Sequence, residues 1–142
     1  MTVSSTRALV VDDSATIRNF VKTALEDQGF DVIEAKSGFE ALKILPKDRF
    51  NLIVTDVNMP DINGLELVKY VRKAEAHRDT PLIIISTDGR ERDRDRGMTL
   101  GATAYLVKPF NPADLIALAR KVMEKGVNVA PLMAPPAPKR SF

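Results

Sequence analysis

Short apolar runs alternate along the chain with longer stretches in which apolar residues recur every three or four positions. The runs predict strands, and their lack of polar alternation is typical of strands that are covered on both faces. The stretches between them have the spacing of amphipathic helices. This alternation predicts an α/β fold in which five βα units build a parallel sheet. The predicted strands are residues 7–11, 30–35, 51–55, 81–86 and 104–107.

Local signals mark the ends of the first two predicted helices. Ser14 suits the cap of the first helix and Gly29 its stop. Ser37 and Glu40 form a capping-box signature for a short second helix, which Pro46 closes. Within the first helix, apolar residues at helical spacing predict a buried stripe of Ile17, Phe20, Val21, Ala24 and Leu25.

The later helices are predicted in the same way. Residues 64–74 form the third, and the charged segment 89–97 is predicted to be a solvated helix face. Asn111 suits the cap of the last helix, with Pro112 at its first position. The apolar stripe of that helix is Leu115, Leu118, Ala119, Val122 and Met123.

Residues 126–142 differ in composition from the rest of the chain. This segment is rich in proline and alanine and has no apolar period, so we expect a domain at 1–125 and a flexible tail at 126–142. The tail should be dispensable for folding and could capture a partner as an extended segment.

Charge and composition exclude several classes of function. The net charge is +2, and removing the tail's Lys139 and Arg140 leaves 19 basic and 19 acidic residues in the domain. A neutral domain lacks the basic footprint of a nucleic-acid binder. The chain has no cysteine, no apolar run of membrane-spanning length and no signal-peptide layout, so we expect a cytoplasmic protein without a membrane partner.

Polar residues gather where the predicted strands end. Asp12 and Asp13 follow the first strand, Asp56 the third, Ser86 ends the fourth and Lys108 follows the fifth. Ligands of open parallel sheets bind at this carboxyl edge. Each residue alone could be a cap, an Asx-turn or a solvated charge. Their convergence on one edge favours a functional site.

The residue types indicate phosphate chemistry. Three neighbouring carboxylates repel one another unless they are protonated or bind a cation, and an all-oxygen set suits Mg²⁺. A divalent cation and Lys108 could neutralise a phosphoryl group transferred to Asp56 as nucleophile, with the Ser86 hydroxyl donating to another oxygen.

Four segments carry a resemblance to a known family: LVVDDSATIRNFV, VTDVNMPDINGLEL, IIISTDG and GATAYLVKPF. They resemble the receiver domain of two-component response regulators, over about residues 7–125, and in particular the single-domain regulators of bacterial chemotaxis. The resemblance implies a flavodoxin-like, doubly wound sheet of strand order 2-1-3-4-5. Helices one and five would cover one face, and helices two, three and four the other.

The resemblance also implies roles for individual residues. Asp56 would accept phosphate from a histidine kinase, and Asp13, Asp56 and the Asn58 backbone carbonyl would ligate Mg²⁺, with Asp12 acting through water. Ser86 and Lys108 would bind phosphoryl oxygens. The remaining implied features are a switch role for Ser86 and Tyr105, a cis peptide before Pro109, and a tight turn at Gly64 after Asn63.

Three residues are implied to tune how long the phosphoryl group lasts. Asn58 and Asp88 match positions that orient the hydrolytic water in the family. Thr87 stands where the family usually has Ala or Gly, and its bulk would slow the attack. Val57 also departs from the pattern, because the best-known chemotaxis members carry Trp there.

Other functions share parts of this pattern. A phosphatase of the haloacid dehalogenase type uses an Asp nucleophile and Mg²⁺ but needs a second Asp where Asn58 stands. A flavin binder would meet its phosphate with two acids after strand one, and a constitutive interaction module would not need the full site. We expect a phosphorylation switch without an attached output domain that docks the surface of helix four, strand five and helix five onto a partner such as a flagellar motor switch. A phosphorelay shuttle or a non-motility regulator is the alternative.

Overall fold

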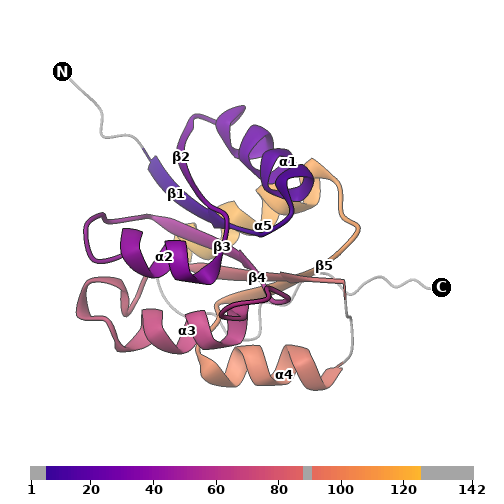
Figure 1. The fold of residues 1–142 in the computed structure, drawn as a ribbon. Helices are drawn as coiled ribbons and strands as arrows, with labels where there is room; N and C mark the ends of the chain where they lie inside the picture. Colours follow the sequence, from indigo (N-terminus) through magenta and orange to yellow (C-terminus); the bar gives the residue numbers. More distant parts are fainter. Residues whose placement is uncertain (1–5, 88–90, 126–142) are drawn as a thin grey trace.

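The computed structural model describes residues 6–87 and 91–125, in which helices cover both faces of a single five-stranded sheet (Figure 1). The strands are β1 (Thr6–Val11), β2 (Phe30–Ala35), β3 (Leu52–Asp56), β4 (Leu82–Ser86) and β5 (Ala104–Val107). The helices are α1 (Ala15–Glu26), α2 (Gly38–Ile44), α3 (Gly64–Lys73), α4 (Glu91–Leu100) and α5 (Pro112–Lys125), with a 3-10 turn, η1, at Glu75–His77.

The sheet is parallel throughout and has the order β2-β1-β3-β4-β5. This confirms the predicted strand order. Across its middle, Val10 pairs with Val54, Val54 with Ile83, and Ile83 with Ala104. The carboxyl ends of the strands therefore lie along one edge.

Two apolar cores separate the sheet from its helices. Leu9, Val11 and Ile53 contribute to the core beneath α2, α3 and α4. Ala8 and Val10 point to the opposite face and join the core beneath α1 and α5. Because successive strand residues point to opposite faces, this run of apolar residues makes both faces of β1 apolar. The helices divide between the two faces as predicted (Figure 1).

The caps of α1 and α5 agree with the sequence signals. Ser14 Oγ accepts from the Ile17 N–H at 3.3 Å, and Asn111 Oδ1 accepts from the Asp114 N–H at 2.8 Å. Gly29 ends the turn after α1 with φ +92°, a left-handed conformation that favours glycine.

The second helix departs slightly from a capping box. Ser37 Oγ accepts from the Glu40 N–H at 3.0 Å as predicted. The Glu40 carboxylate instead accepts from the Lys36 N–H at 2.6 Å, one residue before the cap. Only the bond to Ser37 satisfies an N–H group that the first helical turn leaves without a partner, whereas the bond to Glu40 fixes the residue before the cap.

Several boundaries and exposures differ from the sequence prediction. Strand β1 begins one residue earlier, β4 begins one residue later and α3 ends one residue earlier than predicted. Strand β3 begins and ends one residue later than predicted, so Asp56 is its last residue, paired with Ile85. Phe20 belongs to the predicted apolar stripe but is 37 % exposed, and it packs edge-on against Phe110. In the described part of the predicted solvated face, Asp95 and Arg96 of α4 are exposed, but Gly97 is buried against Ile84; residues 89 and 90 lie outside the described residues.

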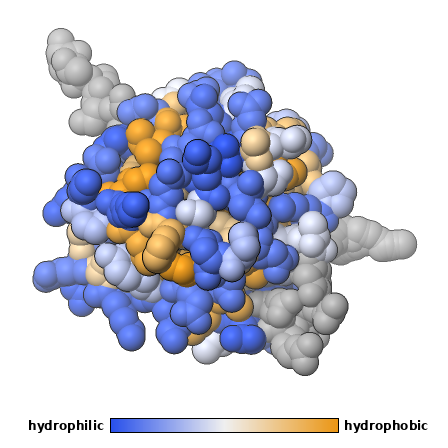
Figure 2. All heavy atoms as spheres, in the orientation of Figure 1, coloured by the Kyte–Doolittle hydropathy of each residue, from blue (hydrophilic) through white to orange (hydrophobic). Residues whose placement is uncertain are grey.

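The surface of the molecule is mostly polar on the face that Figure 2 shows. Figure 2 shows a face on which hydrophilic residues predominate and hydrophobic residues form small, separate groups. None of the helices within residues 6–87 and 91–125 is both long enough and apolar enough to cross a membrane. The predicted tail and Asp88 lie outside the described residues.

Candidate phosphorylation site

The site lies at the carboxyl edge of the sheet, where four strands deliver one or two polar residues each. Asp12 and Asp13 follow β1, and Asp56 ends β3. Ser86 ends β4, and Lys108 follows β5. The parallel register brings these residues together although they are far apart in sequence.

The three aspartates form one cluster. Each offers a carboxylate oxygen, and these oxygens lie within 4.8 Å of one another. Asp12 and Asp56 are buried, at 3 % and 4 % exposed, whereas Asp13 is exposed. The cluster therefore meets solvent on the Asp13 side, while its other two acids are held inside the protein.

Lys108 supplies a positive charge to this cluster. Its Nζ lies 2.9 Å from Asp56 Oδ1 and 3.9 Å from Asp12 Oδ2. The Lys108 backbone N–H donates to the Ser86 carbonyl at 2.8 Å, which fixes the end of β5 against that of β4. The Lys108–Pro109 peptide is cis, as the resemblance implied.

The effect of burial on the pKa values of the buried aspartates outweighs the opposing effect of Lys108. Desolvation raises the pKa of the Asp56 carboxyl, and the hydrogen bond and charge of Lys108 oppose the rise. Desolvation likewise raises the pKa of Asp12, although its carboxylate accepts from the Ser14 N–H at 2.9 Å. One lysine is thus too little positive charge for three acids, and the all-oxygen donor set fits a hard divalent cation.

The turn after β1 is held by several hydrogen bonds. Arg18 Nη1 donates to the Asp12 carbonyl at 2.8 Å, and Arg18 Nε donates to Glu34 Oε1 at 3.0 Å. Ser14 both donates to Asp12 and caps α1. These bonds fix the backbone that carries Asp12 and Asp13.

The β3–α3 loop (residues 57–63) is anchored at both of its ends. The Val57 N–H donates to the Ile85 carbonyl at 3.0 Å, and the Gly64 N–H donates to the Val57 carbonyl at 2.8 Å. A side chain at Gly64 would place its Cβ 2.3 Å from the Asp56 carbonyl oxygen. Gly64 therefore permits the tight turn predicted for it by allowing this close approach, without a positive φ. Asn63 caps α3 by accepting from the Glu66 N–H.

The structure also places the other predicted site residues. Asn58 lies in the loop between buried Val57 and Met59, with its own side chain exposed. Ser86 and Tyr105 are each 1 % exposed. Thr87 is exposed at the rim, and Asp88 lies outside the described residues.

Sequence reasoning missed the residues that support this site from other elements. The sequence signals assigned no role to Arg18 or to Asp61. Each contacts residues distant in sequence, Arg18 reaching Glu34 and Asp61 reaching Phe39. Their charge was visible in the sequence, but no local pattern indicated their partners.

The fold and site define a flavodoxin-like α/β protein with an acidic, cation-compatible site at the carboxyl edge of its sheet. Residues 8–120 match the response regulator receiver domain family. The chain belongs to this family. Receiver domains are signalling switches that take phosphate from histidine kinases, bind Mg²⁺ at an acidic pocket and act on downstream targets.

Relatives of several kinds share this domain. A chemotaxis protein CheY homolog of Campylobacter jejuni is 40 % identical over 122 residues, which cover 84 % of this chain and 94 % of that protein. The high-resolution structure of chemotaxis response regulator CheY4 of Vibrio cholerae has a TM-score of 0.80 and 40 % identity, covering 84 % of this chain and 99 % of that one. The phosphate regulon transcriptional regulatory protein PhoB of Escherichia coli is 36 % identical, and the match covers 84 % of this chain and 52 % of PhoB.

Proposed function

We propose that this protein is a phosphorylation switch in which Asp56 accepts a phosphoryl group from a histidine kinase. The observation that carries this proposal is the buried Asp56 carboxylate, held 2.9 Å from Lys108 Nζ and within 4.8 Å of two further acids. A carboxylate oxygen of Asp56 attacks the phosphorus of the phosphohistidine, the P–N bond breaks, and the leaving imidazole takes up a proton.

The surrounding residues stabilise the charge of the transferred group. We assign Asp13, Asp56 and the Asn58 backbone carbonyl as direct ligands of Mg²⁺, with Asp12 acting through water. When bound, the cation neutralises charge on the phosphoryl oxygens. Lys108 moves from its ion pair with Asp56 to a phosphoryl oxygen, and the Ser86 hydroxyl donates to another oxygen.

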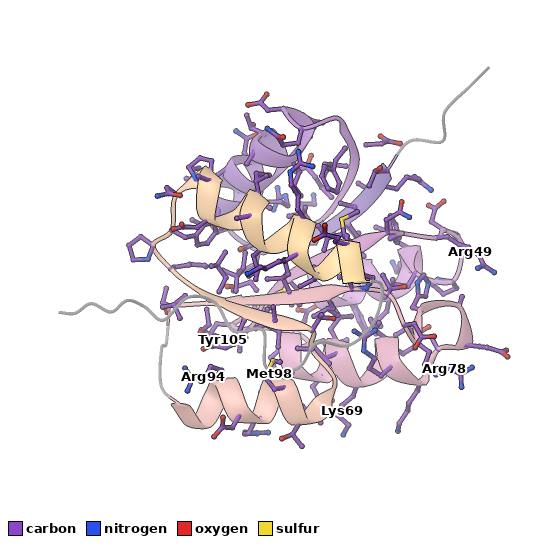
Figure 3. All side chains as sticks on the ribbon, turned by 180° about the vertical axis from the view of Figure 1, so that it is seen from behind. Arg49, Lys69, Arg78, Arg94, Met98 and Tyr105 are labelled. Atoms are coloured by element: carbon purple, nitrogen blue, oxygen red, sulfur yellow. The ribbon has the colours of Figure 1, made fainter. Side chains whose placement is uncertain are left out.

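The output surface in this proposal consists of α4, β5 and α5. Figure 3 shows Arg94 and Met98 on the side of α4 that faces β5, near Tyr105. Tyr105 is buried in the core beneath α4, against which Met98 also packs. A change at Ser86 or Lys108 therefore reaches α4 through tightly packed side chains.

The names of the relatives support a role in chemotaxis or motility control. The Campylobacter and Vibrio proteins, each 40 % identical to this chain over most of their length, are both described as chemotaxis proteins. We therefore propose a partner such as a flagellar motor switch. The family match at residues 8–120 supports a receiver domain at 1–125, with 126–142 as a tail.

Phosphorylation of the purified protein tests this proposal. Wild type incubated with labelled acetyl phosphate and Mg²⁺ should take up label, and Asp56→Asn or wild type in EDTA should not. Asp48→Asn is a matched control, because Asp48 pairs with Arg7 before β3, at the opposite edge of the sheet, and it should label normally. Label on Asp56→Asn would refute the assignment. Sustained release of phosphate from a phosphomonoester would instead favour the dehalogenase-type phosphatase.

A further inference from the structure

The N-terminus of α2 is bound by a carboxylate from the β3–α3 loop. Asp61 Oδ2 accepts from the Phe39 N–H at 2.9 Å, and Asp61 Oδ1 accepts from the Gly38 N–H at 3.4 Å. Ser37 already caps the same helix by accepting from the Glu40 N–H. The helix start therefore has two caps, one from its own chain segment and one from a loop more than twenty residues away.

Close packing reinforces this contact. A Cβ at Gly38 would lie 2.6 Å from the Ile62 carbonyl oxygen and 2.7 Å from Ile62 Cβ. Only glycine lets the loop approach α2 this closely. Asp61 and Ile62 thus attach the middle of the loop to α2 by hydrogen bonds and by contact.

The same loop carries part of the proposed phosphorylation site. Its ends are held at Val57 and Gly64, and Asn58 lies between the first of these anchors and Asp61. The Asn58 side chain is exposed, so its own packing does not fix the loop. Val57 and Met59 on either side of Asn58 are buried, and the attachment to α2 adds a restraint on the loop beyond Met59.

We propose that Asp61 is a positioning residue for the phosphorylation site, acting by fixing the loop backbone at Asn58 through α2. This inference rests on the proposed function, which assigns the Asn58 carbonyl to the cation. A small displacement of one ligand is enough to weaken a site that demands near-octahedral geometry, as Mg²⁺ does. The N–H groups of Phe39 and Ile62 also lower the pKa of the Asp61 carboxyl, so the carboxylate is charged at neutral pH.

The alternative is that Asp61 merely stabilises α2. Ser37→Ala is the matched control for that possibility, because it removes the other cap of the same helix without touching the loop. Asp61→Asn keeps an acceptor oxygen for the Phe39 N–H and should restore part of the function. Gly38→Ala perturbs the loop from the side of the helix.

Calorimetric titration with Mg²⁺, initial labelling rate with acetyl phosphate, and melting temperature should be measured for each variant. We expect Asp61→Ala and Gly38→Ala to weaken Mg²⁺ binding by about three- to tenfold, below the range for residues that contact ligands directly. Asp61→Asn should fall between Asp61→Ala and wild type. Ser37→Ala should lower the melting temperature but change the Mg²⁺ dissociation constant by less than about twofold.

Two results would overturn the inference. One is Mg²⁺ affinity in Asp61→Ala equal to that of wild type, and the other is Ser37→Ala losing affinity as strongly as Asp61→Ala. Failure of the proposed function looks different, because wild type itself would then neither bind Mg²⁺ nor take up label. The backbone amide shifts of Asn58 during the Mg²⁺ titration give a further readout, since they should move less in Asp61→Ala than in Ser37→Ala.

Discussion

Replacing Asp12 by Asn should stabilise the protein in the absence of Mg²⁺. Asp12 is 3 % exposed and shares the site with Asp13 and Asp56. Asn has nearly the same shape, and its side-chain oxygen can still accept from the Ser14 N–H. The substitution therefore removes one buried negative charge and leaves the local packing in place.

The magnitude follows from the charges around Asp12. A carboxylate 4.8 Å away, the largest separation within the cluster, repels Asp12 by about 3.5 kcal/mol at an effective dielectric constant of about 20, and Asp12 has two such neighbours. Lys108 Nζ, 3.9 Å from Asp12 Oδ2, offsets this with an attraction of about 4 kcal/mol. The two repulsions exceed this attraction and desolvation adds to them, while the hydrogen bond from the Ser14 N–H and solvent screening on the Asp13 side reduce the net penalty. We expect a net gain in the free energy of unfolding of about 1 kcal/mol for Asp12→Asn, and a rise in melting temperature of about 4 °C.

The pH dependence has a definite sign. Burial raises the pKa of Asp12 above the ordinary value of 3.8, so the folded protein binds this proton more tightly than the unfolded chain. The stabilisation that comes from this tighter proton binding is fully present below the pKa of Asp12 in the unfolded chain. It is lost as the pH rises through the pKa of Asp12 in the folded protein. The difference between Asp12→Asn and wild type should therefore be largest near neutral pH and should disappear on acidification toward pH 4.

Urea unfolding in EDTA at several pH values measures this effect. Asp79→Asn removes the same charge from an exposed position, and its stability should stay within about 0.5 kcal/mol of wild type. Saturating Mg²⁺ should reverse the order, because wild type gains more from a cation that binds only the folded state. If Asp12→Asn were less stable than wild type in EDTA at neutral pH, the attraction of Lys108 would outweigh repulsion and desolvation, and the inferred excess of negative charge at the site would be wrong.

The remaining predictions concern the lysine, the tail and the lifetime of the phosphoryl group. Lys108→Ala should fold, accept phosphate slowly and signal poorly, and it should bind Mg²⁺ more tightly in a titration because the cation becomes the sole compensating charge; weaker binding would contradict this. Truncation after Lys125 should leave the melting temperature unchanged, and a fall of several degrees would show that the tail packs on the domain. In decay assays on labelled protein, Asn58→Ala and Asp88→Ala should each slow dephosphorylation and Thr87→Ala should speed it modestly; wild-type decay in Asp88→Ala would show that this pair does not orient the water.

Much of the fold could be predicted because it depends on local signals. Strands β2 and β5 have the predicted bounds, since each is a short apolar run between clear breaks. The caps at Ser14 and Asn111 were also predictable, because a side chain there bonds to an N–H three residues away. The gathering of polar residues at one edge of the sheet was also predictable, because parallel strands place their carboxyl ends together.

Contacts between distant segments could not be predicted in this way. The bond from the Phe39 N–H to Asp61 joins two segments whose separation in the sequence carries no pattern. His77 is another example, because it is 2 % exposed and its Nε2 lies 2.7 Å from the Leu45 carbonyl oxygen. No sequence signal marked His77 as a buried residue. Only the packing of η1 against the end of α2 explains its burial.

Two sites of buried charge in the described part of the chain differ in how fully hydrogen bonds and opposite charges compensate them. Arg72 lies between α3 and the α4–β5 turn, and its guanidinium donates to the carbonyl oxygens of Gly101, His77 and Arg78 and to Thr103 Oγ1. Several acceptors from different elements satisfy this one charge, so it ties the elements together.

The negative charge of the acidic cluster, in contrast, is only partly compensated. Desolvation raises the pKa of both Asp12 and Asp56 despite the nearby Lys108, so the folded chain leaves part of their negative charge without compensation. A charge that is fully hydrogen-bonded resists change, whereas one that is only partly compensated responds to a proton, a cation or a phosphoryl group. The hydrogen-bonded turns around Asp12 and Asp56 keep the acids from relaxing apart, and the stability lost to their desolvation and repulsion is the reason we propose that this edge of the sheet responds to ligands.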